Sequence, residues 1–211
     1  MPEQEESVRA FIAIELPPAV REEIARVQRE ARAGGFNFVK WVEAGSIHLT
    51  LKFLGSVPAR QVADIVRALE RAAGRRAPFR LAVAGAGLFP GASAPRVAWL
   101  GLEGDLDALR DLQESVEENV APLGYPTERR RFAPHLTLAR LREGASPVER
   151  RRFGEALLAL KSRSVEIRVG AIALMQSRLS PLGARYSRLA ESPLRVPSKE
   201  GSGGEGKAET V

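Results

Sequence analysis

The chain has 211 residues, a length that suits one large domain or two lobes of about 100 residues each, and its 44% hydrophobic content is typical of a globular protein and excludes a fibrous or wholly disordered chain. Its 32 Lys and Arg outnumber 26 Asp and Glu, and the formal net charge of +6 favours anionic partners such as nucleic acid or phosphorylated metabolites. The absence of cysteine excludes disulfides, thiolate zinc sites, thiol nucleophiles and iron–sulfur clusters.

The N-terminal segment does not resemble a targeting sequence. Residues 1–7 are acidic, whereas the start of a signal peptide is basic. No apolar run approaches the roughly 20 residues that a membrane-spanning helix needs. We therefore expect a cytoplasmic protein without a membrane partner.

The first half of the chain alternates short apolar runs with amphipathic stretches. The β-branched run at 8–14 indicates a buried strand. Pro18 can occupy the first turn of a helix that extends to residue 31 and presents Val20, Ile24 and Val27 on one face. The same criteria then predict strands at 38–42 and 47–54, a helix at 58–73, and strands at 79–89 and 97–102.

The second half repeats this order of elements. In chain order we expect a helix at 105–120, a strand at 132–138, a helix at 147–160 capped by Ser146, a strand at 165–175 and a segment at 184–189 that pairs back. Residues 198–211 are rich in Gly, Ser, Glu and Lys and cannot bury apolar surface. We therefore expect one domain at 1–197 and a disordered C-terminal tail at 198–211.

A repeated tetrapeptide indicates an internal duplication. His48-Leu49-Thr50-Leu51 recurs residue for residue as His135-Leu136-Thr137-Leu138, 87 residues later. Each copy is followed by a helix that should begin at a proline, Pro58 or Pro147, and then by a β-rich run. The prediction is an α+β, bilobal, duplicated fold with pseudo-two-fold symmetry. Two antiparallel sheets should flank a central cleft, with helices on the outside and the two repeated strands facing each other.

The repeated motif places two kinds of reactive side chain together. In a strand, residues i and i+2 share a face, so His48 lies with Thr50 and His135 with Thr137. One imidazole can take a proton from a nucleophile while the other gives one to a leaving oxygen, each step contributing roughly 10²- to 10⁴-fold. Hydroxyl donors suit the non-bridging oxygens of a phosphoryl group. The four side chains therefore predict acid–base catalysis at a phosphate.

Two other interpretations of the histidines have to be compared with catalysis. A single histidine in an apolar strand is commonly a packed core residue, but these two are the only histidines in the chain and occupy equivalent places in the repeat. A metal site would need further ligands, and neither tetrapeptide has an acidic residue at a suitable spacing. We therefore expect catalytic histidines, no metal and no cofactor.

The doubled motif resembles the His-x-Thr-x pair of the 2H phosphoesterase superfamily. Within it, the flanking segments resemble the bacterial and archaeal RNA 2′,3′-cyclic phosphodiesterases, also called 2′-5′ RNA ligases. These segments are residues 11–17, 40–42, 51–55, 89–90, 134–140 and 177–179. The resemblance covers about residues 8–189.

The resemblance implies metal-independent opening of a 2′,3′-cyclic phosphate at an RNA end to leave a 2′-phosphomonoester, with a reversible 2′-5′ ligation as a secondary activity. By analogy with the superfamily, His48 protonates the leaving group and His135 activates water; pseudo-symmetry leaves open which imidazole lies beside the 3′ oxygen. Arg140 resembles the family arginine that follows the second motif and reaches the phosphate. Phe11 and Phe53 are candidates to stack a terminal base, and the alternative is that both are core residues.

An excess of arginine around the second motif could guide an RNA backbone to the cleft, although such residues also form ordinary solvated surface. The residues are Arg129, Arg130, Arg131, Arg140, Arg142, Arg150, Arg151 and Arg152. The expected partners are RNA ends that carry a 2′,3′-cyclic phosphate, with tRNA fragments as one source, and the expected state is a monomer. Two alternatives stay open: a non-catalytic RNA-binding module, and a phosphoesterase for a cyclic nucleotide or an ADP-ribose cyclic phosphate.

Overall fold

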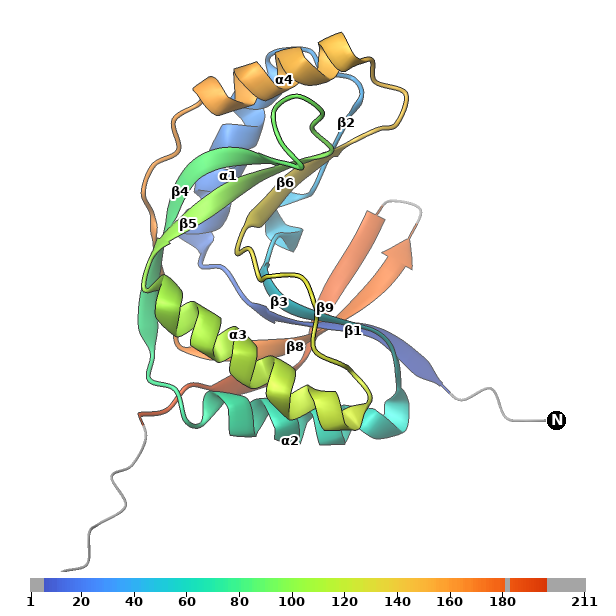
Figure 1. The fold of residues 1–211 in the computed structure, drawn as a ribbon, viewed down its shortest axis with the longest axis vertical. Coiled ribbons are helices and arrows are strands. Elements are labelled where there is room, and N and C mark those ends of the chain that lie inside the picture. Colours follow the sequence, from blue (N-terminus) through green and yellow to red (C-terminus); the bar gives the residue numbers. More distant parts are fainter. Residues whose placement is uncertain (1–5, 181–182, 197–211) are drawn as a thin grey trace, which may run out of the picture.

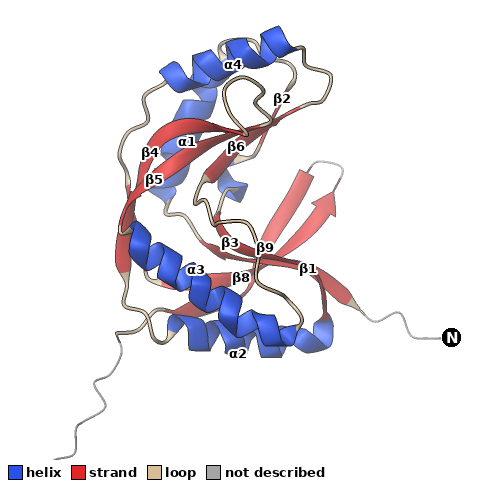
Figure 2. Cartoon of the chain, in the orientation of Figure 1, coloured by secondary structure: helices blue, strands red, loops and turns tan. Residues whose placement is uncertain are grey.

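The computed structural model describes residues 6–180 and 183–196, which form two antiparallel sheets with a helix pair behind each (Figure 1 and Figure 2). The four-stranded sheet has the order β3 (Leu49–Pro58), β1 (Ser7–Ile14), β8 (Ala171–Ser180) and β9 (Gly183–Pro193). The five-stranded sheet has the order β2 (Val39–Trp41), β6 (Leu136–Leu141), β5 (Val97–Gly104), β4 (Phe79–Phe89) and β7 (Glu166–Val169). This arrangement confirms the predicted fold class, with the repeated strands β3 and β6 in different sheets.

Helices cover the outer side of each sheet, as Figure 2 shows. Helices α2 (Val62–Ala73) and α3 (Leu106–Val120) pack against each other and against the four-stranded sheet. Helices α1 (Pro18–Arg32) and α4 (Pro147–Ala159) lie with the five-stranded sheet at the other end of the molecule. Within the described residues, no helix is long and apolar enough to cross a membrane.

Two helices begin where the sequence predicts, and local interactions explain both starts. Pro18 begins α1 at a position where the missing N–H costs no hydrogen bond. At α4, the Ser146 hydroxyl accepts from the Glu149 N–H while the Glu149 carboxylate accepts from the Ser146 N–H, which is a complete capping box. The predicted cap at residue 105 is different, because the Asp105 carboxylate accepts from the N–H of Arg80 and joins α3 to β4.

Three predicted boundaries are wrong. Pro58 ends β3 rather than beginning a helix, and α2 starts only after a 3₁₀ turn at Ala59–Gln61. The single strand expected at 165–175 is two strands in different sheets, β7 and β8, because the chain crosses between the sheets at Gly170. The strand expected at 132–138 begins only at Leu136. The expected tail at 198–211 lies outside the described residues.

The two sheets do not correspond to the two halves of the sequence. The central pair of the four-stranded sheet joins β1 from the start of the chain to β8 from near its end, with Phe11 opposite Met175. The five-stranded sheet likewise mixes strands from both halves. One continuous apolar core includes Ile12, Leu49, Leu112 and Leu138 and extends through both lobes. The lobes are therefore interlocked rather than stacked end to end.

Candidate active site

His48 and His135 occupy equivalent places, each directly before the strand that carries its threonine. The Nδ1 atom of His48 lies 3.0 Å from the carbonyl oxygen of Ser46, and that of His135 lies 2.7 Å from the carbonyl oxygen of Ala133. A carbonyl oxygen only accepts hydrogen bonds, so each neutral imidazole carries its proton on Nδ1. Nε2 is then left on both rings as the atom that can accept or, once protonated, donate a proton in the cavity.

Aromatic rings surround each imidazole edge-on. His48 lies between Phe11, at 5.9 Å between ring centroids, and Tyr186, at 5.5 Å. His135 lies beside Phe89 at 5.0 Å and Trp99 at 6.3 Å. Tyr186, Phe89 and Trp99 were not predicted as site residues, because these positions belong to no repeated motif. Each aromatic pair fixes the plane of its imidazole and removes water from part of the ring.

This partial burial lowers the pKa of both histidines from the ordinary 6.5. In each case the hydrogen bond to the backbone carbonyl opposes the effect of burial, because it favours the charged ring. The positive charges of Arg140 and Arg130 lower the pKa of His135 further. Both imidazoles of the free protein are therefore mainly neutral at pH 7 and become available for proton transfer.

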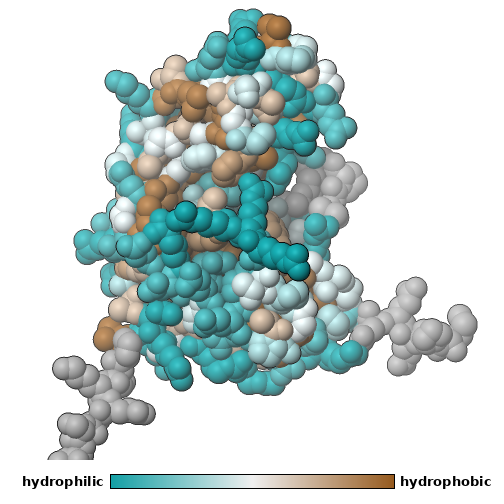
Figure 3. Space-filling model, in the orientation of Figure 1, coloured by the Kyte–Doolittle hydropathy of each residue, from teal (hydrophilic) through white to brown (hydrophobic). Residues whose placement is uncertain are grey.

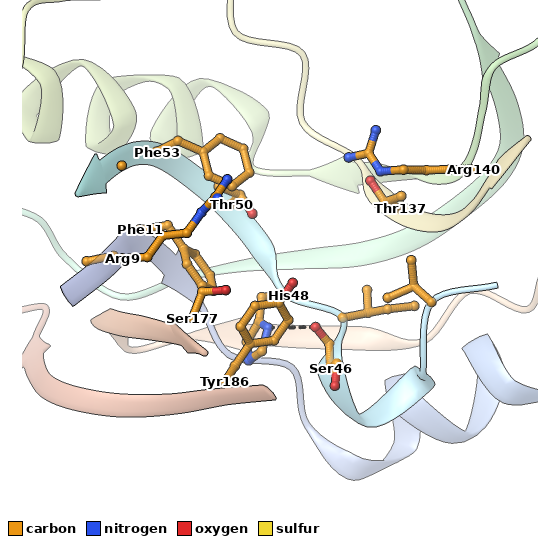
Figure 4. Close-up of a pocket in the computed structure, with 14 residues that line it drawn as sticks. Arg9, Phe11, Ser46, His48, Thr50, Phe53, Thr137, Arg140, Ser177 and Tyr186 are labelled. Atoms are coloured by element: carbon orange, nitrogen blue, oxygen red, sulfur yellow. Dashed lines mark hydrogen bonds between the residues drawn. The ribbon is translucent and has the colours of Figure 1, made fainter. Parts of the chain in front are cut away.

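Both histidines line one continuous cavity between the lobes. Its two adjoining parts, of about 350 and 370 Å³, share five lining residues. The shared residues are His48, Thr50, Phe53, Thr137 and Arg140. The first part adds Arg9, Phe11, Ser177 and Tyr186, and the second adds Phe89, Arg130, Arg131 and His135. The structure thus brings all seven predicted site residues together, and Figure 4 shows Thr137 and Arg140 across the space from His48 and Phe11.

A β-bulge in β3 determines which side chains reach the cavity. Thr50 pairs with Ala13 of β1, Leu51 has no partner, and the pairing resumes at Lys52. The extra residue turns the strand over, so Thr50 and Phe53 share the cavity face although their odd spacing would place them on opposite faces of a regular strand. Phe53 is 67% exposed there, so the alternative that it is a core residue is wrong.

The same bulge occurs at the same place in β6. Thr137 pairs with Trp99 of β5, Leu138 has no partner, and the pairing resumes with Ala139 and Arg140. Arg140 therefore occupies the position in the second copy that Phe53 occupies in the first. The duplication places an aromatic ring on one wall of the cavity and a guanidinium on the other.

Phe11 belongs to both the core and the cavity. It is only 5% exposed, as the core alternative requires, yet it lines the cavity and its ring centroid lies 6.1 Å from that of Phe53. Its burial against Ala13, Ala173 and Met175 leaves it to support Phe53 and His48 from below. A base in the cavity would therefore meet the exposed face of Phe53 first.

The arginines around the second motif lie in different surroundings. Arg130 and Arg131 line the cavity beside His135, and Figure 3 shows hydrophilic side chains over α3 and the adjoining loop. Arg142 and Arg152 line a different hollow, between the α1–β2 and β6–α4 loops. Arg150 donates to four backbone carbonyls and ties α4 to its loops. The expectation that the whole set guides RNA is therefore too broad.

No group of three or more histidine, aspartate and glutamate side chains that could hold a metal ion occurs in the part of the chain that the structure describes. Imidazoles, hydroxyls, guanidinium groups and aromatic rings are among the groups that line the cavity. Such groups are chemically suited to binding a phosphate ester and to proton transfer.

Comparison with known proteins finds relatives that match most of the chain. An RNA 2′,3′-cyclic phosphodiesterase of Geobacillus stearothermophilus is 35% identical over 95% of this chain, and the chain spans 62% of that protein. One of Methanothermobacter thermautotrophicus is 34% identical over 85% of this chain and 95% of that protein.

Solved structures of the same kind superpose on this chain. TT0787 of Thermus thermophilus has a TM-score of 0.74 and 32% identity, with 89% of this chain and 98% of that chain covered. Escherichia coli LigT complexed with 3′-AMP has a TM-score of 0.68 and 29% identity, with 90% and 99% covered. The sequence model of the family described as LigT like Phosphoesterase matches twice, at residues 14–99 and 100–186. The two matches confirm the internal duplication, and the chain belongs to the LigT-like phosphoesterase family.

Proposed function

We propose that this protein hydrolyses 2′,3′-cyclic phosphate ends of RNA to 2′-phosphomonoesters. The observation that carries the proposal is that two imidazoles, each with Nδ1 held by a backbone carbonyl, line one cavity with two threonines and an arginine. The relatives named RNA 2′,3′-cyclic phosphodiesterase support this substrate class.

The reaction requires one neutral and one protonated imidazole. Nε2 of His135 takes a proton from water as the water oxygen bonds to phosphorus. The bond between phosphorus and the 3′ oxygen breaks, and Nε2–H of His48 gives its proton to that oxygen. The strain of the five-membered cyclic ester means that oriented water, a base and an acid are sufficient. A final proton exchange with solvent restores both rings.

Substrate binding is assigned to the remaining side chains of the cavity. The Thr50 and Thr137 hydroxyls donate to the non-bridging oxygens, and the planar fork of Arg140 binds the phosphate from the other wall. Phe53 stacks the terminal base, supported by Phe11. The phosphate is then held between lobes whose histidines approach it from two sides.

RNA, rather than a free cyclic nucleotide, is favoured by the basic surface next to the site. Arg130 and Arg131 are exposed and line the cavity beside His135, at a position where they would meet the phosphates preceding the terminal nucleotide. We also propose tRNA fragments as substrates, a cytoplasmic monomer as the working state, one domain at 1–197 with a tail at 198–211, and 2′-5′ ligation as the reverse reaction.

The decisive experiment incubates the protein, in chelator, with an oligonucleotide that ends in a 2′,3′-cyclic phosphate and identifies the product by phosphorus NMR. A 2′-phosphomonoester is expected; a 3′-phosphate would overturn the regiochemistry. His48→Ala and His135→Ala should each lose turnover and keep most RNA affinity. If the wild-type protein binds the oligonucleotide without turnover, it is an RNA-binding module. Equal kcat/KM for the oligonucleotide and a cyclic mononucleotide would favour the small substrate.

A further inference from the structure

Lys52 and Phe53 reverse the usual distribution of charged and apolar side chains. The Lys52 side chain is 2% exposed and faces α3, whereas Phe53 is 67% exposed on the cavity face. The equivalent residues of the second copy follow the ordinary rule, with Ala139 buried and Arg140 exposed. Hydrophobic partition alone would turn Lys52 out and Phe53 in, so another interaction has to maintain the observed arrangement.

Two bulges allow this stretch of β3 to turn over locally. Leu51 and Leu54 both lack partners on β1, so the strand has two surplus residues between the ladder pairs on either side. Those pairs are Thr50 with Ala13 and Gly55 with Ala10. Lys52 already borders the second part of the cavity with its side chain directed to α3. If Leu51 took the place of Lys52 opposite β1, the ammonium would turn into the cavity and Phe53 would leave that face, with both flanking pairs unchanged. The threonine of the motif would stay where it is.

Glu117 of α3 holds Lys52 in its buried position. The Lys52 ammonium donates to the Glu117 carboxylate and, at 2.9 Å, to the carbonyl oxygen of Pro126. Glu117 also accepts from Gln113 at 3.0 Å and from the N–H of Glu128 at 3.3 Å, and its side chain is 4% exposed. With these partners, the buried charges are satisfied; without them, a buried ammonium is strongly unfavourable.

We propose that the Lys52–Glu117 ion pair selects the register of β3 between its two bulges and thereby holds Phe53 at the cavity as the base-stacking residue. Glu117 is then a positioning residue that determines which side chain the terminal nucleotide meets. The inference deepens the proposed function, because it assigns the origin of base binding at that site. It also explains why a lysine is buried next to an exposed phenylalanine.

The register can be measured without activity, because the chain has no cysteine. In a Phe53→Cys variant, the new thiol should react rapidly with a thiol reagent. Adding Glu117→Gln leaves the buried ammonium without its charged partner and with the Pro126 carbonyl as a neutral acceptor, so Lys52 should turn outward and the reaction should slow by about tenfold. Adding Lys52→Met as well removes the positive charge at position 52. The apolar methionine should stay buried against α3, and rapid labelling of position 53 should return. General unfolding would accelerate labelling, so the two effects have opposite signs.

The matched control is Glu23→Gln, which removes another buried carboxylate, paired with Arg26 and the Arg163 N–H and absent from the cavity lining. It should leave labelling at position 53 unchanged. Faster or unchanged labelling in the Glu117→Gln background, or slower labelling in the control, would overturn the register proposal. The labelling experiment tests the register even if the wild-type protein fails to open a cyclic phosphate. That failure would reject the proposed function but not the register proposal.

Steady-state kinetics provide a second test of the register proposal. Glu117→Gln should raise KM for the RNA cyclic phosphate about tenfold, as expected for a lost base stack, and Phe53→Ala should then add nothing further. Lys52→Met with Glu117→Gln should restore KM and again make it sensitive to Phe53→Ala. If the effects of Glu117→Gln and Phe53→Ala simply multiply, the ion pair does not act through Phe53 and the inference is wrong.

Discussion

The pH dependence of the wild-type reaction tests the paired histidines directly. Burial lowers the pKa of both His48 and His135 from 6.5, and catalysis needs one ring neutral and the other protonated. The population with the required pair of states therefore peaks below pH 6.5 in the free enzyme. Above that pH the acid loses its proton, and kcat/KM should fall about tenfold per pH unit, or about thirtyfold between pH 6.5 and 8.

The profile of kcat should differ, because it reports the complex with substrate. A cyclic phosphodiester carries one negative charge throughout this pH range, and an anion beside an imidazole favours the charged ring. We expect the descending limb of kcat about one pH unit or more above that of kcat/KM, a shift that corresponds to about 1.4 kcal/mol per unit. The limbs are macroscopic values of the pair and do not assign acid and base.

The assay is a set of initial rates from pH 4.5 to 9 at constant ionic strength, with circular dichroism at each pH to confirm that the protein is folded. A substrate with a better leaving group at the 3′ position identifies whether chemistry limits the rate. If kcat/KM is flat between pH 6 and 9 while chemistry is limiting, proton transfer by the two histidines is refuted. A single ascending limb with no descent would eliminate the imidazolium as the acid.

Four further outcomes are expected. Excess chelator should leave turnover unchanged, and recovery on adding Zn²⁺ or Mn²⁺ to a chelator-inactivated sample would contradict metal-independent chemistry. A good leaving group at the 3′ position should rescue His48→Ala but not His135→Ala in rate assays; rescue of the latter alone would reverse the two roles. Phe53→Ala should raise KM by a factor of about 5 to 150 with little change in kcat or in urea unfolding, and a large fall in kcat would place the ring at the phosphate. Gln28→Leu removes the buried amide that donates to the carbonyl oxygens of Val42 at 2.7 Å and Leu138 at 3.0 Å, of which the second still accepts from the Val42 N–H; it should lower the unfolding free energy in urea by about 1–3 kcal/mol, and an unchanged midpoint would show that water replaces the amide.

The centre of the candidate site could be predicted from the sequence because its information is local. A tetrapeptide repeated without change places His48 with Thr50 and His135 with Thr137 in any strand, whatever the rest of the fold does. The aromatic supports of the imidazoles could not be predicted in this way. Tyr186 reaches His48 only because the hairpin of β8 and β9 pairs with β1 through β8, a long-range pairing that the residues near Tyr186 do not specify.

The rule that successive side chains alternate between the two faces of a strand also fails across each bulge. From Thr50 to Phe53 the spacing is odd, and a regular strand would bury the phenylalanine. The bulge at Leu51 is favoured by contacts on another element, since Lys52 finds its partner on α3. Such a pairing joins residues 65 positions apart, so no pattern within the strand reveals it.

The exchange of strands between the halves has a consequence for biosynthesis. β1 lies between β3 and β8, so a nascent chain that ends before Ala171 leaves one edge of β1 without its partner strand. Long-range pairing of this kind forms late and exposes an open edge until it does. His48 lacks Tyr186 until β9 has also been made. Each half of the duplicated chain therefore lacks strands that the other half supplies, and a ribosome-bound chain that ends before Ala171 already contains both histidines but lacks the β8 partner of β1 and the Tyr186 neighbour of His48.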